Sequence, residues 1–256
     1  MIILLTNDDG VYAPGIAALK AALAHLGEVT LVAPDAERSA TSHSITLDRP
    51  LRVREVFVGN DFLGYGVDGS PADCVKIGVK QILHSPPDLV VSGINLGANV
   101  GINVLYSGTV AAGLEGAILG VTSVAVSLAA STKPDFRSAA MLACMVIAQI
   151  LENKPPRGSL FNLNIPSCPP GAMLGLSLAK QSTVSYDDAF DVRKDPRGGR
   201  YFWMTGELQK DQLPPDSDTA LLARGYVTLT PLHYDLTDTK MLTAATAWSI
   251  TLSKPD

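Results

Sequence analysis

The sequence has few cysteines and no apolar run long enough to cross a membrane. Its three cysteines, Cys74, Cys144 and Cys168, lie far apart without a C-x-x-C motif, so neither a disulfide framework nor a zinc site is supported. The longest apolar runs, at 117–130 and 139–151, fall short of the roughly 20 residues that a transmembrane helix needs. No basic segment typical of a targeting sequence is apparent. We therefore expect reduced thiols, no membrane contact and a cytoplasmic location.

An excess of positive charge is also lacking. The chain has 20 Lys and Arg residues against 25 Asp and Glu residues, a net charge of −5, and a pI near 5.3. The densest group of cations, within residues 191–200, is interrupted by aspartates. A surface that binds a nucleic-acid polymer needs a basic patch, so we expect no such partner.

Several motifs of nucleotide and hydrolase chemistry are missing. There is no Walker A sequence, no G-x-G-x-x-G fingerprint and no G-x-S-x-G elbow, which excludes the usual nucleoside-triphosphate, dinucleotide and serine-hydrolase sites. The four histidines show no close ligand spacing. Metal-assisted phosphate chemistry is the class that remains.

What the sequence does contain is an alternation of apolar runs and helix-like segments. With 256 residues, 46% apolar and 18% charged, the chain is long enough for one α/β domain that spans residues 1–256. We expect buried strands at 2–6, 28–33, 88–92, 121–128 and 159–165, and helices that begin at Pro14, Pro71, Gly108 and Arg137. This pattern predicts a mostly parallel sheet between two layers of helices.

Two regions depart from that alternation. Residues 46–58 and 62–67 indicate an inserted antiparallel pair with a turn at Gly59 and Asn60, or else an irregular loop. Residues 182–215 are loop-like in composition, whereas 201–204 and 226–231 resemble paired strands that project from the core. We expect the C-terminal region, roughly 182–256, to supply arms for oligomerisation.

Ligands of open α/β sheets bind beyond the carboxyl ends of the strands, and the first predicted strand ends in two acids. Asp8 and Asp9 are adjacent, and carboxylates that face one site repel each other unless a cation lies between them. An Asx turn that caps the next helix is the alternative. At this point both interpretations stay open.

Later turns add oxygen donors and backbone amides. The loop that contains Ser39 is rich in hydroxyls, and Asn95 in a glycine-rich turn offers a side-chain carbonyl; a polar surface loop and a simple turn are the alternatives. Ser107, Gly108 and Thr109 precede a helix, where free N–H groups bind phosphate, unless Ser107 only caps that helix. Such oxygen donors suit Mg²⁺, Mn²⁺ or Ca²⁺.

Taken together, these segments resemble a known family. They carry the motifs TNDDG at 6–10, APGI at 13–16, VAPD at 32–35, SIT at 44–46, GSPADCV at 69–75, PDLVVSGIN at 87–95, YSGTV at 106–110, NLNIP at 162–166 and GYVTLTPL at 225–232. The sequence is similar, almost from end to end, to the SurE survival-protein family of metal-dependent 5′(3′)-nucleotidases.

The resemblance implies a Rossmann-like three-layer α/β/α sandwich with projecting β-hairpin arms. It also implies that Asp8, Asp9, Ser39 and Asn95 bind one divalent cation per subunit. The expected activity is that of a phosphoric monoester hydrolase, a 5′-nucleotidase, that releases phosphate from nucleoside monophosphates. Some relatives also act on short polyphosphate. A homodimer or homotetramer is the implied assembly.

Two positions depart from the family pattern. Ser70 stands where threonine is expected, and Ala40 follows Ser39 where glycine is usual. Serine keeps the hydroxyl, so the first change has little consequence. Alanine forbids some backbone angles that glycine allows, which bears on the geometry of the Ser39 loop.

The mechanism expected from these residues is in-line hydrolysis at a bound cation. Ser107, Gly108 and Thr109 would cradle the phosphate. Asn95 would contact both metal and substrate, and Asp8 would orient or deprotonate the attacking water.

Other functions fit the same residues. A broad acid phosphatase or exopolyphosphatase would share the site, and a non-catalytic metal or phosphate sensor would bind without turnover. A haloacid-dehalogenase-like phosphatase would need aspartates in D-x-D spacing, whereas here they are adjacent.

Overall fold

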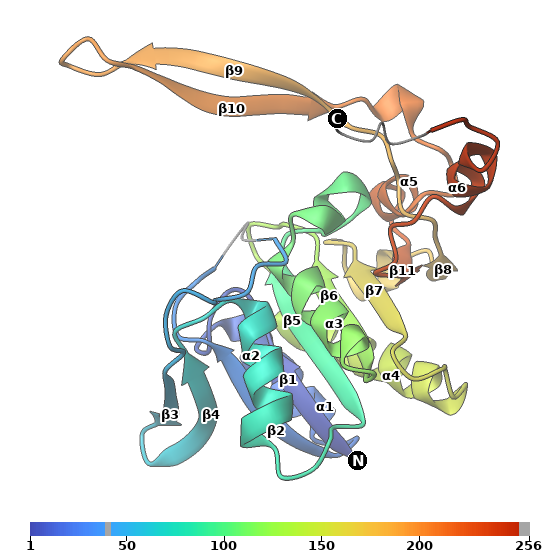
Figure 1. The fold of residues 1–256 in the computed structure, drawn as a ribbon. Helices are drawn as coiled ribbons and strands as arrows, with labels where there is room; N and C mark the ends of the chain where they lie inside the picture. The colour runs from blue at the N-terminus through green and yellow to red at the C-terminus, as the bar shows by residue number, and fades with distance from the viewer. Residues whose placement is uncertain (39–41, 251–256) are drawn as a thin grey trace, which may run out of the picture.

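A nine-stranded sheet forms the centre of the computed structural model, which describes residues 1–38 and 42–250 (Figure 1). Six neighbouring strands, from β4 to β7 in sheet order, run parallel, and β3 and β11 pair antiparallel to their neighbours β4 and β7. The sheet order is β3 (Val53–Val58), β4 (Asp61–Val67), β2 (Glu28–Pro34), β1 (Ile2–Thr6), β5 (Leu89–Leu96), β6 (Thr122–Leu128), β7 (Leu160–Ile165), β11 (Val227–Leu232) and β8 (Leu176–Leu178).

Helices cover both faces of this sheet. In Figure 1, α2 (Pro71–Ile77) and α3 (Gly108–Ile118) lie in front of the strands, and α1 (Pro14–Leu23) and α4 (Phe136–Glu152) lie behind them. Pairs α1–α4 and α2–α3 pack against each other. The predicted three-layer α/β/α sandwich is confirmed.

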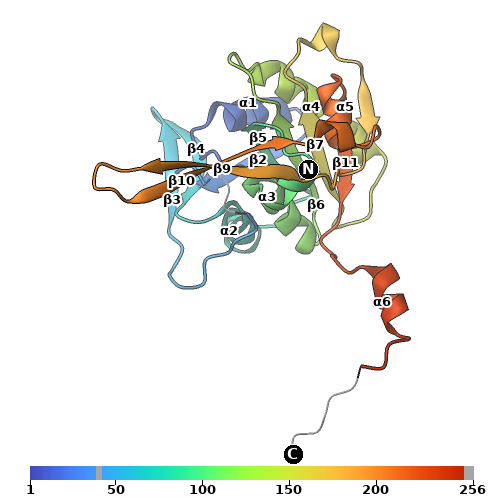
Figure 2. The ribbon, with the colours of Figure 1, turned by 90° about the horizontal axis from the view of Figure 1, so that it is seen from above.

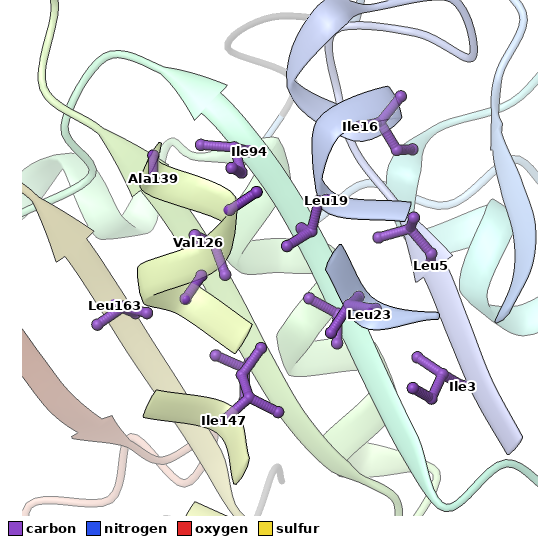
Figure 3. Close-up of a cluster of buried hydrophobic side chains, with 14 of the residues drawn as sticks. Ile3, Leu5, Ile16, Leu19, Leu23, Ile94, Val126, Ala139, Ile147 and Leu163 are labelled. Atoms are coloured by element: carbon purple, nitrogen blue, oxygen red, sulfur yellow. The ribbon is translucent and has the colours of Figure 1, made fainter. Parts of the chain in front are cut away.

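The core divides between the two faces because side chains alternate along each strand. Ile3 and Leu5 point to the α1–α4 face, where they join residues such as Leu19 and Ile147 (Figure 3). Leu4 lies in the cluster under α2 and α3. Strands buried on both faces read as continuous apolar runs, which is why their positions are visible in the sequence.

The remaining helical elements are short. They are η1 (Gly78–Ile82), η2 (Gly101–Leu105), η3 (Pro170–Ala172), η4 (Lys210–Gln212), α5 (Asp218–Ala223) and α6 (Thr239–Ala245). No helix within the described residues is both long enough and apolar enough to cross a bilayer.

The predicted antiparallel pair at 46–58 and 62–67 is partly confirmed. β3 and β4 are antiparallel and turn at Gly59 and Asn60, but β3 begins only at Val53, and residues 46–52 form no strand. The pair is not a separate insertion, since β4 continues the main sheet beside β2.

The predictions for the C-terminal region need two corrections. Residues 182–215 are not a loop, because β9 (Tyr186–Lys194) and β10 (Arg200–Leu208) form a long antiparallel hairpin within them. Residues 201–204 therefore pair with β9, and 227–231 belong to β11 between β7 and β8. Val227 to Thr230 are buried on both faces, so this segment buries more apolar surface as an inner strand than it would as an arm. Figures 1 and 2 show the hairpin projecting from the sandwich.

Candidate metal and phosphate site

The carboxyl ends of β1 and β5 bring the predicted acids and Asn95 to one edge of the sheet. Thr6 of β1 is in register with Ser92 of β5. Beyond Ser92 the register of β5 with β6 shifts, and Gly93 has a φ of 133°, a region that side-chain-bearing residues seldom adopt. The backbone of Leu96 lies close enough to Asp9 to lower the pKa of its carboxyl. Asp9 and Asn95 therefore lie at the same corner.

Asn7 builds the turn that presents the two acids. Its side chain accepts a hydrogen bond from the N–H of Gly10 (3.2 Å) and donates one to the carbonyl of Gly10 (2.9 Å). The turn does not cap α1, whose N-cap, Ala13, makes no side-chain hydrogen bond. The Asx turn therefore belongs to Asn7, and neither Asp8 nor Asp9 is used to cap the helix.

Asp8 is fixed against the N-terminus of α3. Its side chain accepts hydrogen bonds from the hydroxyl of Thr109 (2.5 Å) and from the N–H of Thr109 (3.2 Å). A Cβ on Gly108 would lie 2.9 Å from Cβ of Asp8, so only glycine permits this approach. The structure therefore joins the first predicted turn to the predicted phosphate-binding segment.

The electrostatics of this corner favour a bound cation. Burial raises the pKa of Asp8 and outweighs the hydrogen bonds from Thr109. Burial, the charge of Asp8 and the charge of Glu37 raise the pKa of Asp9 to about 6. Two carboxylates that repel each other at a partly dry site are stabilised by a divalent ion.

The N-terminus of α3 retains a backbone donor for an anion. The hydroxyl of Ser107 caps the helix by accepting from the N–H of Val110 (3.1 Å), as the alternative interpretation proposed. Thr109 is fully buried and donates to Asp8. In the part of the chain that the structure describes, the N–H of Gly108 has no partner. Phosphate binding by residues 107–109 stays a prediction, with Gly108 as its most direct contact.

Asn95 and Ser39 complete the predicted ligand set. Nδ2 of Asn95 donates to the carbonyl of Gly97 (2.7 Å), which leaves Oδ1 as the atom suited to a cation. Ser39 and Ala40 lie outside the described residues. The residue before them is at the site, since the N–H of Arg38 donates to the carbonyl of Asp8 (2.8 Å).

Buried polar residues to which the sequence analysis assigned no role hold the loop after Asn95. Oδ1 of Asn164 accepts from the N–H of Asn99 (2.8 Å), and Asn162 donates to the carbonyl of Asn99 (2.8 Å). Asp218 accepts from the N–H of Gly101 (2.8 Å). The sequence signal for these contacts was the presence of Asn162 and Asn164 in an otherwise apolar strand, because buried amides need hydrogen-bond partners.

Comparisons with known proteins show the family of the chain. The family model of survival protein SurE matches residues 3–188. The 5′-nucleotidase SurE of Syntrophus aciditrophicus is 48% identical over 235 residues, 91% of this chain and 88% of the relative. The 5′-nucleotidase SurE of Rhodopirellula baltica is 47% identical, over 98% of this chain and 99% of the relative. The crystal structure of the SurE protein from Aquifex aeolicus superposes with a TM-score of 0.85 at 37% identity, covering 95% of this chain and 98% of that one. The chain therefore belongs to the SurE survival protein family.

Proposed function

We propose that this chain is a divalent-metal-dependent phosphoric monoester hydrolase that releases phosphate from nucleoside 5′- and 3′-monophosphates. The convergence of Asp8, Asp9, Asn95 and the N-terminus of α3 at one sheet edge carries the proposal. The name of its relatives, 5′-nucleotidase, supports the 5′ activity.

The residues present fit a hard cation. Asp8 and Asp9 supply carboxylate oxygens whose ionised forms are disfavoured without a positive neighbour, and Asn95 supplies Oδ1; Ser39 is the fourth predicted ligand. All are oxygen donors, which suit Mg²⁺ or Mn²⁺, with Ca²⁺ also compatible. When bound, such an ion polarises phosphoryl oxygens and lowers the pKa of water.

The protein groups then divide the remaining work. The N–H of Gly108, at the positive end of α3, binds the phosphate. Thr109 holds Asp8 in one direction through two hydrogen bonds, so that a carboxylate oxygen of Asp8 orients the attacking water and takes its proton. Asn95 positions the substrate phosphate beside these groups.

A cleft beside the phosphate segment favours nucleotides over simple phosphate esters. It has a volume of about 350 Å³ and borders Ser107, within the size range of small-molecule sites. Leu105, Val110 and Leu114 supply apolar walls. The rings of His233 and Tyr234 stack on each other at 4.9 Å and line the same space. Such a surface suits a nucleoside and not a bare polyphosphate chain.

The exposed C-terminal region supports an oligomer. Apolar side chains of the hairpin, such as Phe190, Phe202 and Trp203, are exposed, and such surfaces mark interaction sites. We propose that residues 1–256 form a single domain. We also propose a homodimer or homotetramer in which the region of roughly 182–256 supplies the contacts between subunits. A cytoplasmic location also stays a prediction.

A substrate panel tests the proposed function. Phosphate release is measured from nucleoside 5′- and 3′-monophosphates, short polyphosphate and simple phosphate esters, with Mg²⁺, with Mn²⁺ and with a chelator. We expect metal-dependent release that is fastest from nucleotides. Equal release from all esters would indicate a general phosphatase, preference for polyphosphate an exopolyphosphatase, and no turnover with any metal a sensor.

A further inference from the structure

The proposed mechanism leaves one buried acid of α3 without a role. Glu115 is 2% exposed, in the middle of the helix that begins at the phosphate segment. Burial raises the pKa of this carboxyl, but hydrogen bonds from His43 and Lys76 outweigh it and hold the pKa below its usual value. Nε2 of His43 donates to Oε2 of Glu115 (2.9 Å), and Lys76 of α2 forms an ion pair with Oε1. An ionised carboxylate is stable at such a depth only with partners of this kind.

His43 belongs to a segment, residues 42–46, that is fastened to the N-terminal ends of α2 and α3. The N–H and the hydroxyl of Ser42 donate to the carbonyls of Tyr106 (3.2 Å) and Leu105 (2.8 Å). Ser42 has a φ of 55°, a conformation that residues other than glycine seldom adopt and that surrounding contacts must hold.

The other end of the segment is fastened to α2. The hydroxyl of Ser70 donates to the carbonyl of Ser44 (2.6 Å). Both the N–H and the hydroxyl of Thr46 donate to the buried carboxylate of Asp73 (3.0 and 2.7 Å). Ser70 and Asp73 also form the capping box of α2, so the segment is attached to a rigid helix terminus.

The segment 42–46, which Glu115 contacts through His43, lies close in sequence to a predicted metal ligand. Ser42 lies three residues after the predicted ligand Ser39, and Arg38 before it is bonded to the carbonyl of Asp8. A metal ligand must be held in place for tight binding, and the groups that orient it are the usual means. We propose that Glu115, acting through His43, is a positioning residue for metal binding by the loop that contains Ser39. The proposal rests on the proposed function, in which Ser39 is a ligand.

The two partners of Glu115 distinguish this role from a purely structural one. Lys76 connects Glu115 to α2, whereas His43 connects it to the loop. If Glu115 only holds α2 and α3 together, the loss of Lys76 should change the stability and the metal binding more than the loss of His43 does. If it holds the loop, the loss of His43 should have the larger effect on metal binding.

The experiment compares His43→Ala, His43→Gln and Lys76→Met with the wild-type chain. Calorimetry measures the Kd for Mn²⁺, and hydrogen exchange measures protection of residues 42–46. We expect His43→Ala to raise the Kd on the order of tenfold, the lower end of what the loss of a ligand-orienting group costs, and to speed exchange at 42–46. His43→Gln retains an N–H donor and should restore both. Lys76→Met should lower the Tm and leave the Kd unchanged.

An unchanged Kd in His43→Ala, or an equal rise in Lys76→Met, would overturn the positioning role. Unchanged exchange at 42–46 in His43→Ala would overturn the attachment itself, whether or not metal binds. Absence of Mn²⁺ binding by the wild-type chain would instead overturn the proposed function, and the positioning role with it.

Discussion

The central strands and the β9–β10 hairpin use apolar residues in opposite ways. Leu4 and Leu5 of β1 are fully buried, because helices cover both faces of the sheet. In the hairpin, Phe202, Trp203 and Met204 are 58%, 60% and 72% exposed, and among the residues that the structure describes β10 pairs with β9 alone (Figure 2). The central strands obtain their packing from the chain itself, whereas the apolar side chains of the hairpin need a second surface. The candidate site lies on the self-sufficient part.

The largest effect is expected from Asp8→Asn. The change keeps the size of the side chain but removes the charge that the cation needs, so the fold should survive and turnover should fall. A bound metal contributes several kcal/mol to the transition state, which corresponds to a loss on the order of a thousandfold. Phosphate release and circular dichroism measure the two outcomes.

The matched control for that variant is Asp88→Asn, the same exchange at the opposite edge of the sheet. Oδ2 of Asp88 accepts from the N–H of Ile2 (2.7 Å), and its carboxylate is exposed. It should keep wild-type turnover. Substantial residual activity in Asp8→Asn would refute the role assigned to Asp8.

Truncation of one core and one hairpin side chain sharpens the comparison. Leu5→Ala leaves a cavity between β1 and α1, and such changes cost about 2–5 kcal/mol in the free energy of unfolding. Trp203→Ala should cost less than about 0.5 kcal/mol at concentrations where the chain is monomeric, because exposed side chains contribute little. Denaturant titrations measure both. Similar losses for the two variants would contradict the distinction.

A polar change on the hairpin tests the second surface. Phe202→Asp combined with Trp203→Asp puts charge on an exposed apolar strand, which should halve or quarter the mass in light scattering while the Tm of the sandwich stays close to that of the wild type. A wild-type chain that is already monomeric would show that the hairpin is no oligomerisation arm.

A small effect of unusual sign is expected from Asp9→Asn. The folded-state pKa of Asp9 is about 6, above its ordinary value, so the stability from its bound proton is present below about pH 4 and lost as the pH rises through 6. At pH 7 without metal, asparagine should therefore stabilise the chain by about 1 kcal/mol, less than the full shift because the carboxyl is partly exposed.

Two further measurements check that sign for Asp9→Asn. The difference from the wild type should vanish near pH 4 and reverse in saturating Mn²⁺, where the wild type gains stability from binding. A less stable variant at pH 7 without metal would contradict the electrostatic account. Urea titrations at each condition provide the free energies of unfolding.

The central sandwich could be predicted from the sequence more fully than the hairpin. Strand β1 and the helix starts at Pro14, Pro71 and Gly108 agree with the structure, because buried runs and helix-opening residues are local signals. Asp8, Asp9 and Asn95 could be placed at one edge because parallel strands end together. A projecting hairpin was expected, but its first strand, 186–194, was predicted to be loop because the surrounding segment is rich in charged and turn residues.

Other parts depend on contacts between distant residues. Nothing local reveals that Thr109 binds Asp8 or that Glu115 binds His43, 72 residues away in the chain. The pairing of β11 with β7 was also invisible, since the sequence shows that a strand exists but not which neighbour buries it. Ser70-x-x-Asp73 was a visible capping-box signal, yet its link to Thr46 was not.

The measurement that tests the central claim most directly is calorimetric titration of Mn²⁺ into the wild-type chain, Asp8→Asn and Asp88→Asn. The account predicts one ion per wild-type and Asp88→Asn chain, and loss of that binding in Asp8→Asn. The same stoichiometry and Kd in Asp8→Asn would contradict a metal site at the carboxyl ends of β1 and β5.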